Sequence, residues 1–317
     1  GDGYQYIDSG GTGTVVTMNS GWQNIASGGT GTVSTMSGGQ QTVNSSGTGT
    51  VNIMNSGAQE ISGGVGIIAV MSGGEQTISS GGAGTVSAMS GGTQIISNGT
   101  GAVSTMSGGI QAISSGGTGT VSIMNDGRQF VDDGGAGTVD IMSGGEQEIY
   151  NGTGIIGTMS DGAQGIRSGG NGTISIMSDG MQRLSSGGTG TVSTMSGGIQ
   201  NIYYGGTGII GTMHNGSQII GGAAFDAIGT IDTMSGGKQM IARGGTGTLS
   251  VMYVDGVQSI LNGGTGTVST MSGGVQFVSS NGVATISSLI GGTQEVNSGG
   301  TALDTVIAGG TQLVSGG

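Results

Sequence analysis

Residues 28–45 read GGTGTVSTMSGGQQTVNS, and this stretch is one copy of a repeat that runs through the whole chain. Methionine marks the repeat, because it recurs every 17 or 18 residues from Met18 to Met213. The series continues to Met271 after steps of 21, 18 and 19 residues. Glycine supplies 79 of the 317 residues, and proline and cysteine are absent. Glycine with a fixed period is typical of a repeat architecture, whereas glycine without one is typical of a disordered chain.

Glutamine follows the same period, five or six residues after each position of the methionine series and after Leu289 and Ile307, which replace methionine in the last two rows. We call these residues the Gln column: Gln23, Gln41, Gln59, Gln76, Gln94, Gln111, Gln129, Gln147, Gln164, Gln182, Gln200, Gln218, Gln239, Gln258, Gln276, Gln294 and Gln312. Gln5 holds the same place in a shorter first row. The column predicts a buried ladder in which each amide hydrogen-bonds to its equivalents one row up and one row down, as stacked amides do in cross-β structures. In this interpretation the glutamines set the register and perform no chemistry.

Each row contains two short segments rich in Val, Ile and Thr, and each segment is bounded by a Gly-Gly pair. This is the pattern of strands joined by tight turns. Helix is disfavoured, since each interior glycine costs about 1 kcal/mol relative to alanine. One such row cannot bury an apolar face alone, so rows must stack. The sequence therefore predicts an all-β fold: a parallel β-solenoid of about 17 rows with an 18-residue repeat, forming a single segment over residues 1–317.

The alternation of side chains along a strand predicts which columns face the core. Gln41 and Val43 share one face, so the residue between them faces outward, as does Glu148 in its own row. On the other strand Val33 faces inward, and the small Gly31 two residues earlier leaves room for a bulky residue of the opposite strand. Met36 stands three residues after Val33 and breaks the alternation, which predicts a bulge or corner where methionine closes the core.

One row is longer than the others. The row over residues 219–238 carries extra residues near positions 221–226, including Phe225. We expect the chain to bulge outward there and to resume the register by Ile231.

Charge and composition exclude several classes of function. A net charge of −12, with five Lys and Arg residues in total, leaves no cationic surface for a nucleic-acid backbone. The lack of cysteine excludes disulfides and thiolate metal sites. A calcium-binding roll would require aspartate where these rows have Val or Ile after Gly-Gly-Thr-Gly-Thr. We therefore expect no cofactor and no metal.

Candidate catalytic groups are sparse. His214 is the only histidine, and it occupies a turn position that holds serine in most rows, so we interpret it as a turn substitution and not as a general base. Six acidic residues gather over neighbouring rows and are the best candidate for a metal site, although a solvated acidic patch is favoured. They are Asp126, Asp132, Asp133, Asp140, Glu146 and Glu148. The sequence predicts that the chain is not an enzyme.

The repeat resembles a known family. Residues 27–33, SGGTGTV, followed by residues 37–43, SGGQQTV, are similar to the strand–loop–strand passenger repeats of autotransporter adhesins, in particular the adhesin involved in diffuse adherence and its self-associating relatives. The resemblance implies a right-handed solenoid exposed on a Gram-negative outer membrane, with roles in attachment, autoaggregation and biofilm formation. Because the chain shows neither a signal peptide nor a translocator barrel, we expect a passenger segment truncated at both ends.

The resemblance also implies partners. These are a receptor on a host cell or bacterium, or a second copy of the chain, and a heptosyltransferase that attaches O-linked heptose to passenger serines. The serines directly after the methionine column suit this modification, since each precedes a turn. They are Ser37, Ser72, Ser90, Ser107, Ser143, Ser160, Ser178, Ser196, Ser235 and Ser272. A competing set precedes the other Gly-Gly pair and includes Ser27, Ser80, Ser115, Ser168 and Ser186.

A second function class competes with the adhesin. Outward Thr-x-Thr pairs, such as Thr12 with Thr14 and Thr30 with Thr32, resemble the flat arrays of ice-binding solenoids. Only seven rows carry both threonines, and residues such as Ile67 interrupt the array. Threonine also favours exposed strand positions in general. Ice binding therefore stays an alternative to the surface adhesin.

Overall fold

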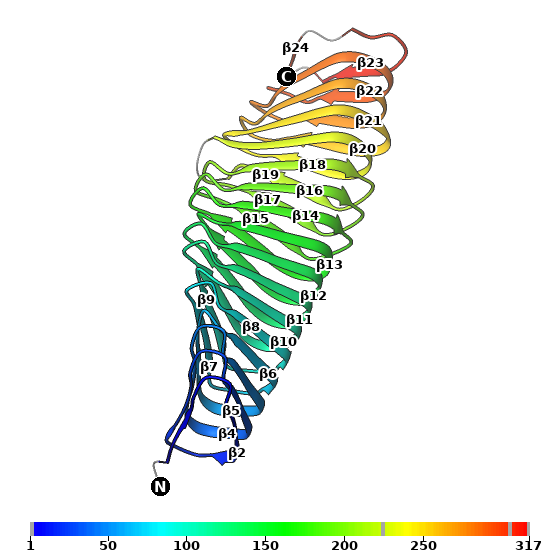
Figure 1. Ribbon diagram of the computed structural model, residues 1–317. Helices are drawn as coiled ribbons and strands as arrows, with labels where there is room; N and C mark the ends of the chain where they lie inside the picture. The colour runs from blue at the N-terminus through cyan, green and yellow to red at the C-terminus, as the bar shows by residue number, and fades with distance from the viewer. Residues whose placement is uncertain (1–2, 223–225, 304–305, 316–317) are drawn as a thin grey trace. The chain divides into compact units, whose positions relative to one another are not determined.

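The chain forms a parallel β-solenoid in the computed structural model, which confirms the predicted fold class (Figure 1). The structure describes residues 3–222, 226–303 and 306–315. Their regular elements are strands, and no helix among them could cross a membrane. The chain divides into two compact units, Gly1–Gly157 and Thr158–Gly317, which are described separately.

The first unit contains the strands β1 to β12 and the beginning of β13. Their bounds are β1 Tyr4–Ile7, β2 Thr12–Met18, β3 Trp22–Ile25, β4 Thr30–Val43, β5 Thr48–Ser62, β6 Val65–Met71, β7 Glu75–Ser79, β8 Ala83–Met89, β9 Thr93–Ser97, β10 Thr100–Ser114, β11 Thr118–Asp132, β12 Ala136–Tyr150 and β13 Thr153–Arg167.

The second unit contains the end of β13 and all later strands. Their bounds are β14 Asn171–Met177, β15 Met181–Leu184, β16 Thr189–Met195, β17 Ile199–Ile202, β18 Thr207–Met213, β19 Ser217–Ile220, β20 Ala227–Ile241, β21 Gly245–Ile260, β22 Thr265–Val278, β23 Val283–Val296, β24 Thr301–Leu303 and β25 Thr311–Val314.

Equivalent residues of successive coils pair in parallel register. Between β4 and β5, for example, Val33 pairs with Val51 and Gln41 pairs with Gln59. The same alignment of equivalents holds in the second unit, where Gln200 pairs with Gln218. One row of sequence is thus one coil of the solenoid, and each sequence column becomes a line of side chains that crosses the coils.

One corner of the coil is a tight turn with left-handed backbone at two consecutive residues. Ser80 and Gly81 have φ of 53° and 76°, and the amide of Gly82 donates to the carbonyl oxygen of Ser79 over 2.9 Å. Positive φ at both central residues is the signature of a type I′ turn. The Gly-Gly pairs before each first strand therefore serve a definite backbone conformation.

The core of each coil is thin. In described coils the inward Val, Ile or Leu, the methionine and the glutamine are almost all fully buried. Glycine is required opposite them: a Cβ on Gly66 would lie 2.7 Å from both Cγ1 of Ile61 and Oε1 of Gln59. Such contacts are shorter than any real Cβ makes, so the two strands of a coil approach as closely as glycine permits.

The Gln column forms a continuous hydrogen-bonded ladder within each unit. Each Nε2 donates to Oε1 of the preceding coil over 2.6–2.7 Å, from Gln147 back to Gln5 in the first unit and from Gln312 back to Gln164 in the second. Several amides also donate to the carbonyl of a core glycine ten residues earlier, as Gln59 does to Gly49 over 3.1 Å. These contacts satisfy amides that are wholly removed from water.

The methionine side chains close the core as predicted. Met36 is fully buried, while the two residues before it, Ser34 and Thr35, both lie on the outside. The backbone pairing of β4 with β5 skips Ser34, and its register shifts directly after Met36. An extra outward residue of this kind is what allows an inward methionine at a spacing of three.

The expectation that Glu148 is exposed is wrong. It lies in the outward column between Gln147 and Ile149, yet only 5% of its surface is exposed. Phe130 is its neighbour in the preceding coil. A column that faces outward is still crowded along its length, because equivalent residues of adjacent coils are only about 4.8 Å apart.

The long row resumes its register early. Ala223, Ala224 and Phe225 lie outside the described residues, so the bulge expected there stays a prediction. Beyond it, Ile228 pairs with Thr207 and Ile231 pairs with Ile210. The in-register ladder is therefore present at Ile231.

The ladder predicts that replacing one central amide destabilises the first unit. Gln59→Leu leaves Oε1 of Gln41 without its donor and Nε2 of Gln76 without its acceptor. Each unsatisfied buried group costs about 1–3 kcal/mol, so we expect a loss of about 2 kcal/mol or more, measured by urea unfolding. The matched control is Glu60→Leu, at the exposed neighbouring position. Equal shifts of the two midpoints would contradict a stabilising role for the ladder.

The thin core predicts that adding a methyl group to a core glycine lowers the free energy of unfolding by an amount that depends on the residue facing that glycine. Alanine replaces the glycine naturally at Ala284, whose facing residue by register is Val278 and not Ile. We expect Gly66→Ala, opposite Ile61, to destabilise by about 1–3 kcal/mol through overpacking. Ile61→Val in the same chain removes the Cδ1 methyl and should restore part of the loss, measured by thermal unfolding. No restoration in the double variant would show that the strain does not lie at the Ile61 side chain, which leaves Oε1 of Gln59 or the backbone.

Candidate functional site

The serines that follow the methionine column form a line along each unit, which we call the serine column. Nine of its ten members are exposed, and Ser235 is half-buried. The backbone explains the position: methionine points inward, the serine after it points outward, and the second glycine after it turns the chain with positive φ, as Gly74 does at 83°. The column thus presents its serines at the same corner of ten of the seventeen coils.

Backbone hydrogen bonds hold the serine column in place. The amide of Ser72 donates to the carbonyl of Met54, and that of Ser90 donates to the carbonyl of Met71, both over 2.9 Å. In the second unit the amide of Ser178 is bound in the same way to Met159. Because each serine is anchored to the previous coil, the spacing between hydroxyl positions follows the strand spacing of about 4.8 Å.

The hydroxyl groups of the column differ in their partners. Ser72 Oγ donates to Oδ1 of Asn55 over 3.0 Å, and Ser143 Oγ makes the same bond to Asn125 over 2.9 Å. The hydroxyls of Ser90, Ser107 and Ser178 form no hydrogen bond to any described residue. A substituent that replaces the hydroxyl proton would remove the donated bond of the first group, whereas the second group has no such bond to lose.

Ser235 has a partner that sequence analysis missed. Its Oγ lies 2.8 Å from Nδ1 of His214 and 3.3 Å from the carbonyl oxygen of Met213. The signal was present in the sequence, since His214 occupies the serine column one coil before Ser235. The contact holds the hydroxyl against the coil, which accounts for the partial burial of this one serine.

The competing serines before the other Gly-Gly pair are also exposed. Ser27, Ser80, Ser115, Ser168 and Ser186 all lie on the outside. Four of them, all except Ser27, have positive φ between 50° and 53°. The two sets of serines therefore differ in backbone conformation and in the corner that they occupy, and not in access to solvent.

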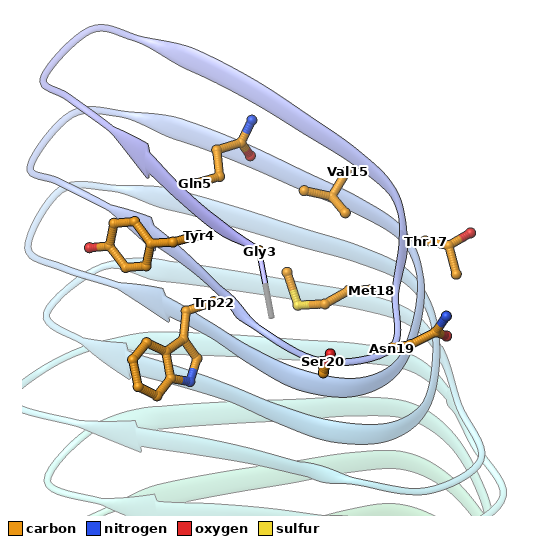
Figure 2. A pocket seen from close by; sticks show the side chains of 9 residues that line it. All are labelled: Gly3, Tyr4, Gln5, Val15, Thr17, Met18, Asn19, Ser20 and Trp22. Carbon is orange, nitrogen blue, oxygen red and sulfur yellow. The ribbon is translucent and has the colours of Figure 1, made fainter. Parts of the chain in front are cut away.

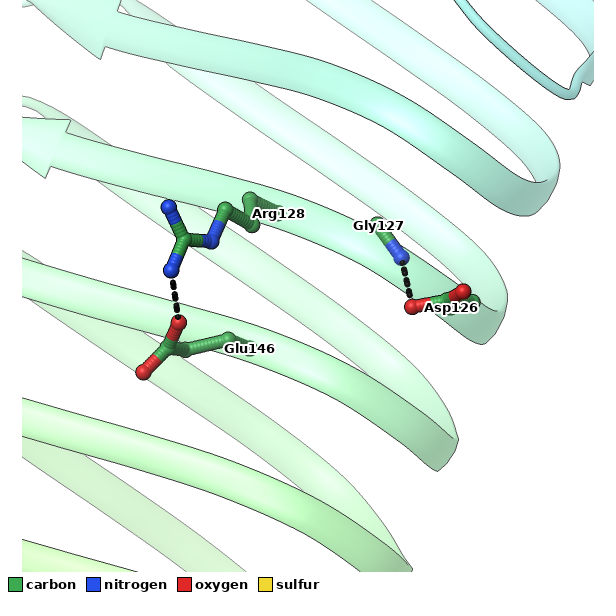
Figure 3. Close-up of polar contacts among 4 residues, drawn as sticks. All are labelled: Asp126, Gly127, Arg128 and Glu146. Atoms are coloured by element: carbon green, nitrogen blue, oxygen red, sulfur yellow. Dashed lines mark hydrogen bonds and ion pairs between the residues drawn. The ribbon is translucent and has the colours of Figure 1, made fainter.

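The acidic residues singled out in the sequence do not converge. Glu146 pairs with Arg128 over 2.8 Å, and Oδ1 of Asp126 accepts from the amide of Gly127 over 2.7 Å (Figure 3). Burial raises the pKa of Asp132, and the charge of Asp133 raises it further. Within the described residues no three acidic or histidine side chains are grouped so as to hold a metal ion.

The threonine pairs form only short arrays. Thr12 and Thr14 pair in register with the equivalent threonines of the next two coils. Val65 and Ile67 take the same two positions in the following coil and end the array. This array is therefore confined to three coils.

No family model and no curated protein matches the chain. Among solved structures, the chain is similar to the crystal structure of a TibA fragment that is hyper-glycosylated in a reaction catalysed by TibC. The two chains are 21% identical, the alignment covers 99% of this chain and 100% of the other, and the TM-score is 0.38. At this level of similarity the functional argument rests on the residues of the chain itself.

Proposed function

We propose that the chain is the passenger of a bacterial surface adhesin, that it mediates attachment, autoaggregation or biofilm formation, and that a heptosyltransferase modifies its serine column. The observation that carries the proposal is the column itself, in which nine exposed serines occupy the same corner of their coils. A transferase that recognises one such corner meets the same backbone again in the next coil. The chain can thus be modified many times without recognition of each local sequence.

The distribution of fixed and variable positions supports the same proposal. The Gln column and the facing glycines hardly change, because the core has no room for other side chains. The outward positions carry residues as different as Trp22, Arg128 and Met181 in one column. A solenoid of this kind offers a long variable surface on an invariant frame, which suits recognition of another surface better than catalysis.

Mapping of attached sugars tests the modification. We expect heptose on the serine column after coexpression with a heptosyltransferase, with the highest occupancy at Ser90, Ser107 and Ser178, whose hydroxyls are bound to no described residue. Occupancy should be lower at Ser72 and Ser143, and lowest at Ser235. Peptide mapping by mass spectrometry gives the occupancies. Sugar confined to in-strand threonines, or no sugar, would overturn this part of the proposal.

A single substitution sharpens that test. His214→Ser removes the 2.8 Å contact to Ser235 and restores the residue type that is common in the column. Heptose at Ser235 should then rise to the occupancy of Ser178 in the same sample. Asp179→Ser, a change at an exposed residue beside Ser178, is the control and should leave Ser235 unchanged.

Surface display tests the adhesin itself. Bacteria that display the chain should settle faster and attach better to epithelial cells than bacteria that display no passenger. Thermal hysteresis of the purified chain, measured in parallel, tests the ice-binding alternative through its threonine pairs. Hysteresis without attachment or aggregation would favour ice binding and contradict the adhesin.

A further inference from the structure

Three exposed aromatic side chains lie together on the first coils of the first unit. Tyr4, Tyr6 and Trp22 are 61%, 58% and 60% exposed. Tyr4 pairs in register with Trp22 across β1 and β3, and Tyr6 lies on the same face two residues after Tyr4. Strand geometry places them about 5 Å apart across the coils and about 7 Å apart along the strand. We call these three residues the aromatic platform.

The platform faces away from the core. Figure 2 shows Tyr4 and Trp22 directed outward from neighbouring coils, whereas Gln5, Val15 and Met18 point into the coil. Aromatic residues are few in this chain, which has one Trp, six Tyr and three Phe, and three of them lie together here. Burial against the solenoid does not account for rings that keep more than half of their surface in water.

A hollow adjoins the platform. It measures about 420 Å³ and is lined by Gly3, Tyr4, Ser20, Gly21, Trp22 and Gly39. Four lining residues have either no side chain or a single hydroxyl, so a ligand that lies on the rings can also approach the backbone. None of the six is charged, although the chain as a whole carries a net charge of −12.

Neutral amides border the platform on its far side. Gln40 follows Trp22 in the next coil, and Asn24 follows Tyr6. Nδ2 of Asn44 donates to Oδ1 of Asn24 over 3.1 Å, so Oδ1 of Asn24 is engaged and its Nδ2 is the group that can donate to a ligand. Gln40 Nε2 lies 3.5 Å from the hydroxyl of Thr42, and Oε1 of the same amide is the group that can accept from a ligand.

We propose that the aromatic platform binds a neutral pyranose unit of an oligosaccharide. The face of an aromatic ring is electronegative, and the axial C–H groups of a pyranose present a weakly positive, apolar face that complements it. The hydroxyl groups at the sugar edge can both donate and accept, and the two amides provide one donor and one acceptor. The platform spans about 5 by 7 Å, which is the size of one sugar ring, and its lack of cations disfavours an anionic ligand.

This inference rests on the proposed function, because it names a ligand class for the adhesin. Sugar binding is nevertheless measured on the purified chain, independently of cell attachment. Trp22 is the only tryptophan, so fluorescence excited at the red edge of the absorption band, where tyrosine does not absorb, reports on the platform alone. Titration with lactose or cellotriose should give a saturable fluorescence change with a dissociation constant on the order of 1 mM, as expected for a small open site. Sialyllactose, which adds a carboxylate to lactose, should bind more weakly.

Substitutions test whether the rings of the aromatic platform themselves bind the sugar. Tyr4→Ala should weaken lactose binding at least about fivefold, and Tyr4→Phe, which keeps the ring, should retain most of it. Tyr253→Ala changes an exposed tyrosine of the second unit and should leave binding unaltered. Unfolding midpoints equal to that of the unaltered chain show that each variant is folded.

Three results would overturn the inference: no saturable change with either neutral sugar, equal binding by Tyr4→Ala and the unaltered chain, or sialyllactose bound as tightly as lactose. Cell attachment distinguishes this failure from that of the adhesin. A chain that binds lactose but attaches to nothing contradicts the adhesin alone. A Tyr4→Ala chain that attaches and binds lactose as before contradicts the platform alone.

Discussion

The closeness of the two strands within a coil is the constraint on which this structure depends. A Cβ on Gly66 would overlap the side chains of Ile61 and Gln59 in front of it, and the same holds along the whole glycine line of the described coils. Bulky side chains from one strand therefore fill the entire width of the core. The constraint explains why one strand carries Gly and Val inward while the other carries Gln and Ile, and why the two patterns cannot be exchanged.

The glutamine ladder adds register to that thin core. An apolar column would tolerate a slip of one coil against the next, since hydrophobic contact has no direction. A buried amide tolerates no slip, because a displaced side chain leaves a donor and an acceptor unsatisfied. All amides of a unit donate toward the preceding coil, and hydrogen bonds aligned in this way strengthen one another. The frame is thus defined by polar contacts as much as by apolar ones, and the outer surface is free to vary.

The sequence was sufficient for those features that repeat and face inward. The solenoid, the inward methionine and the glycine opposite isoleucine each follow from a column whose residue type hardly changes. The contact between His214 and Ser235, the burial of Glu148 and the grouping of Tyr4 with Trp22 were not predicted. Each depends on which side chains stand beside one another in adjacent coils, at positions where every row differs. Comparison of residues 17 to 21 positions apart within one column is the signal that could have found them.

The in-register pairing of equivalent residues also bears on how such a chain changes over time. Each coil contacts its neighbours through the same Val, Met and Gln positions, so Gln59 would meet Gln94 much as it now meets Gln76. Unequal recombination can add or remove a whole row. The remaining coils then still contact one another through the same kinds of residue. A shift of one or two residues within a strand would instead turn the core face outward. Length in whole coils is therefore a property that this lineage can alter in one genetic step, while its cross-section stays fixed.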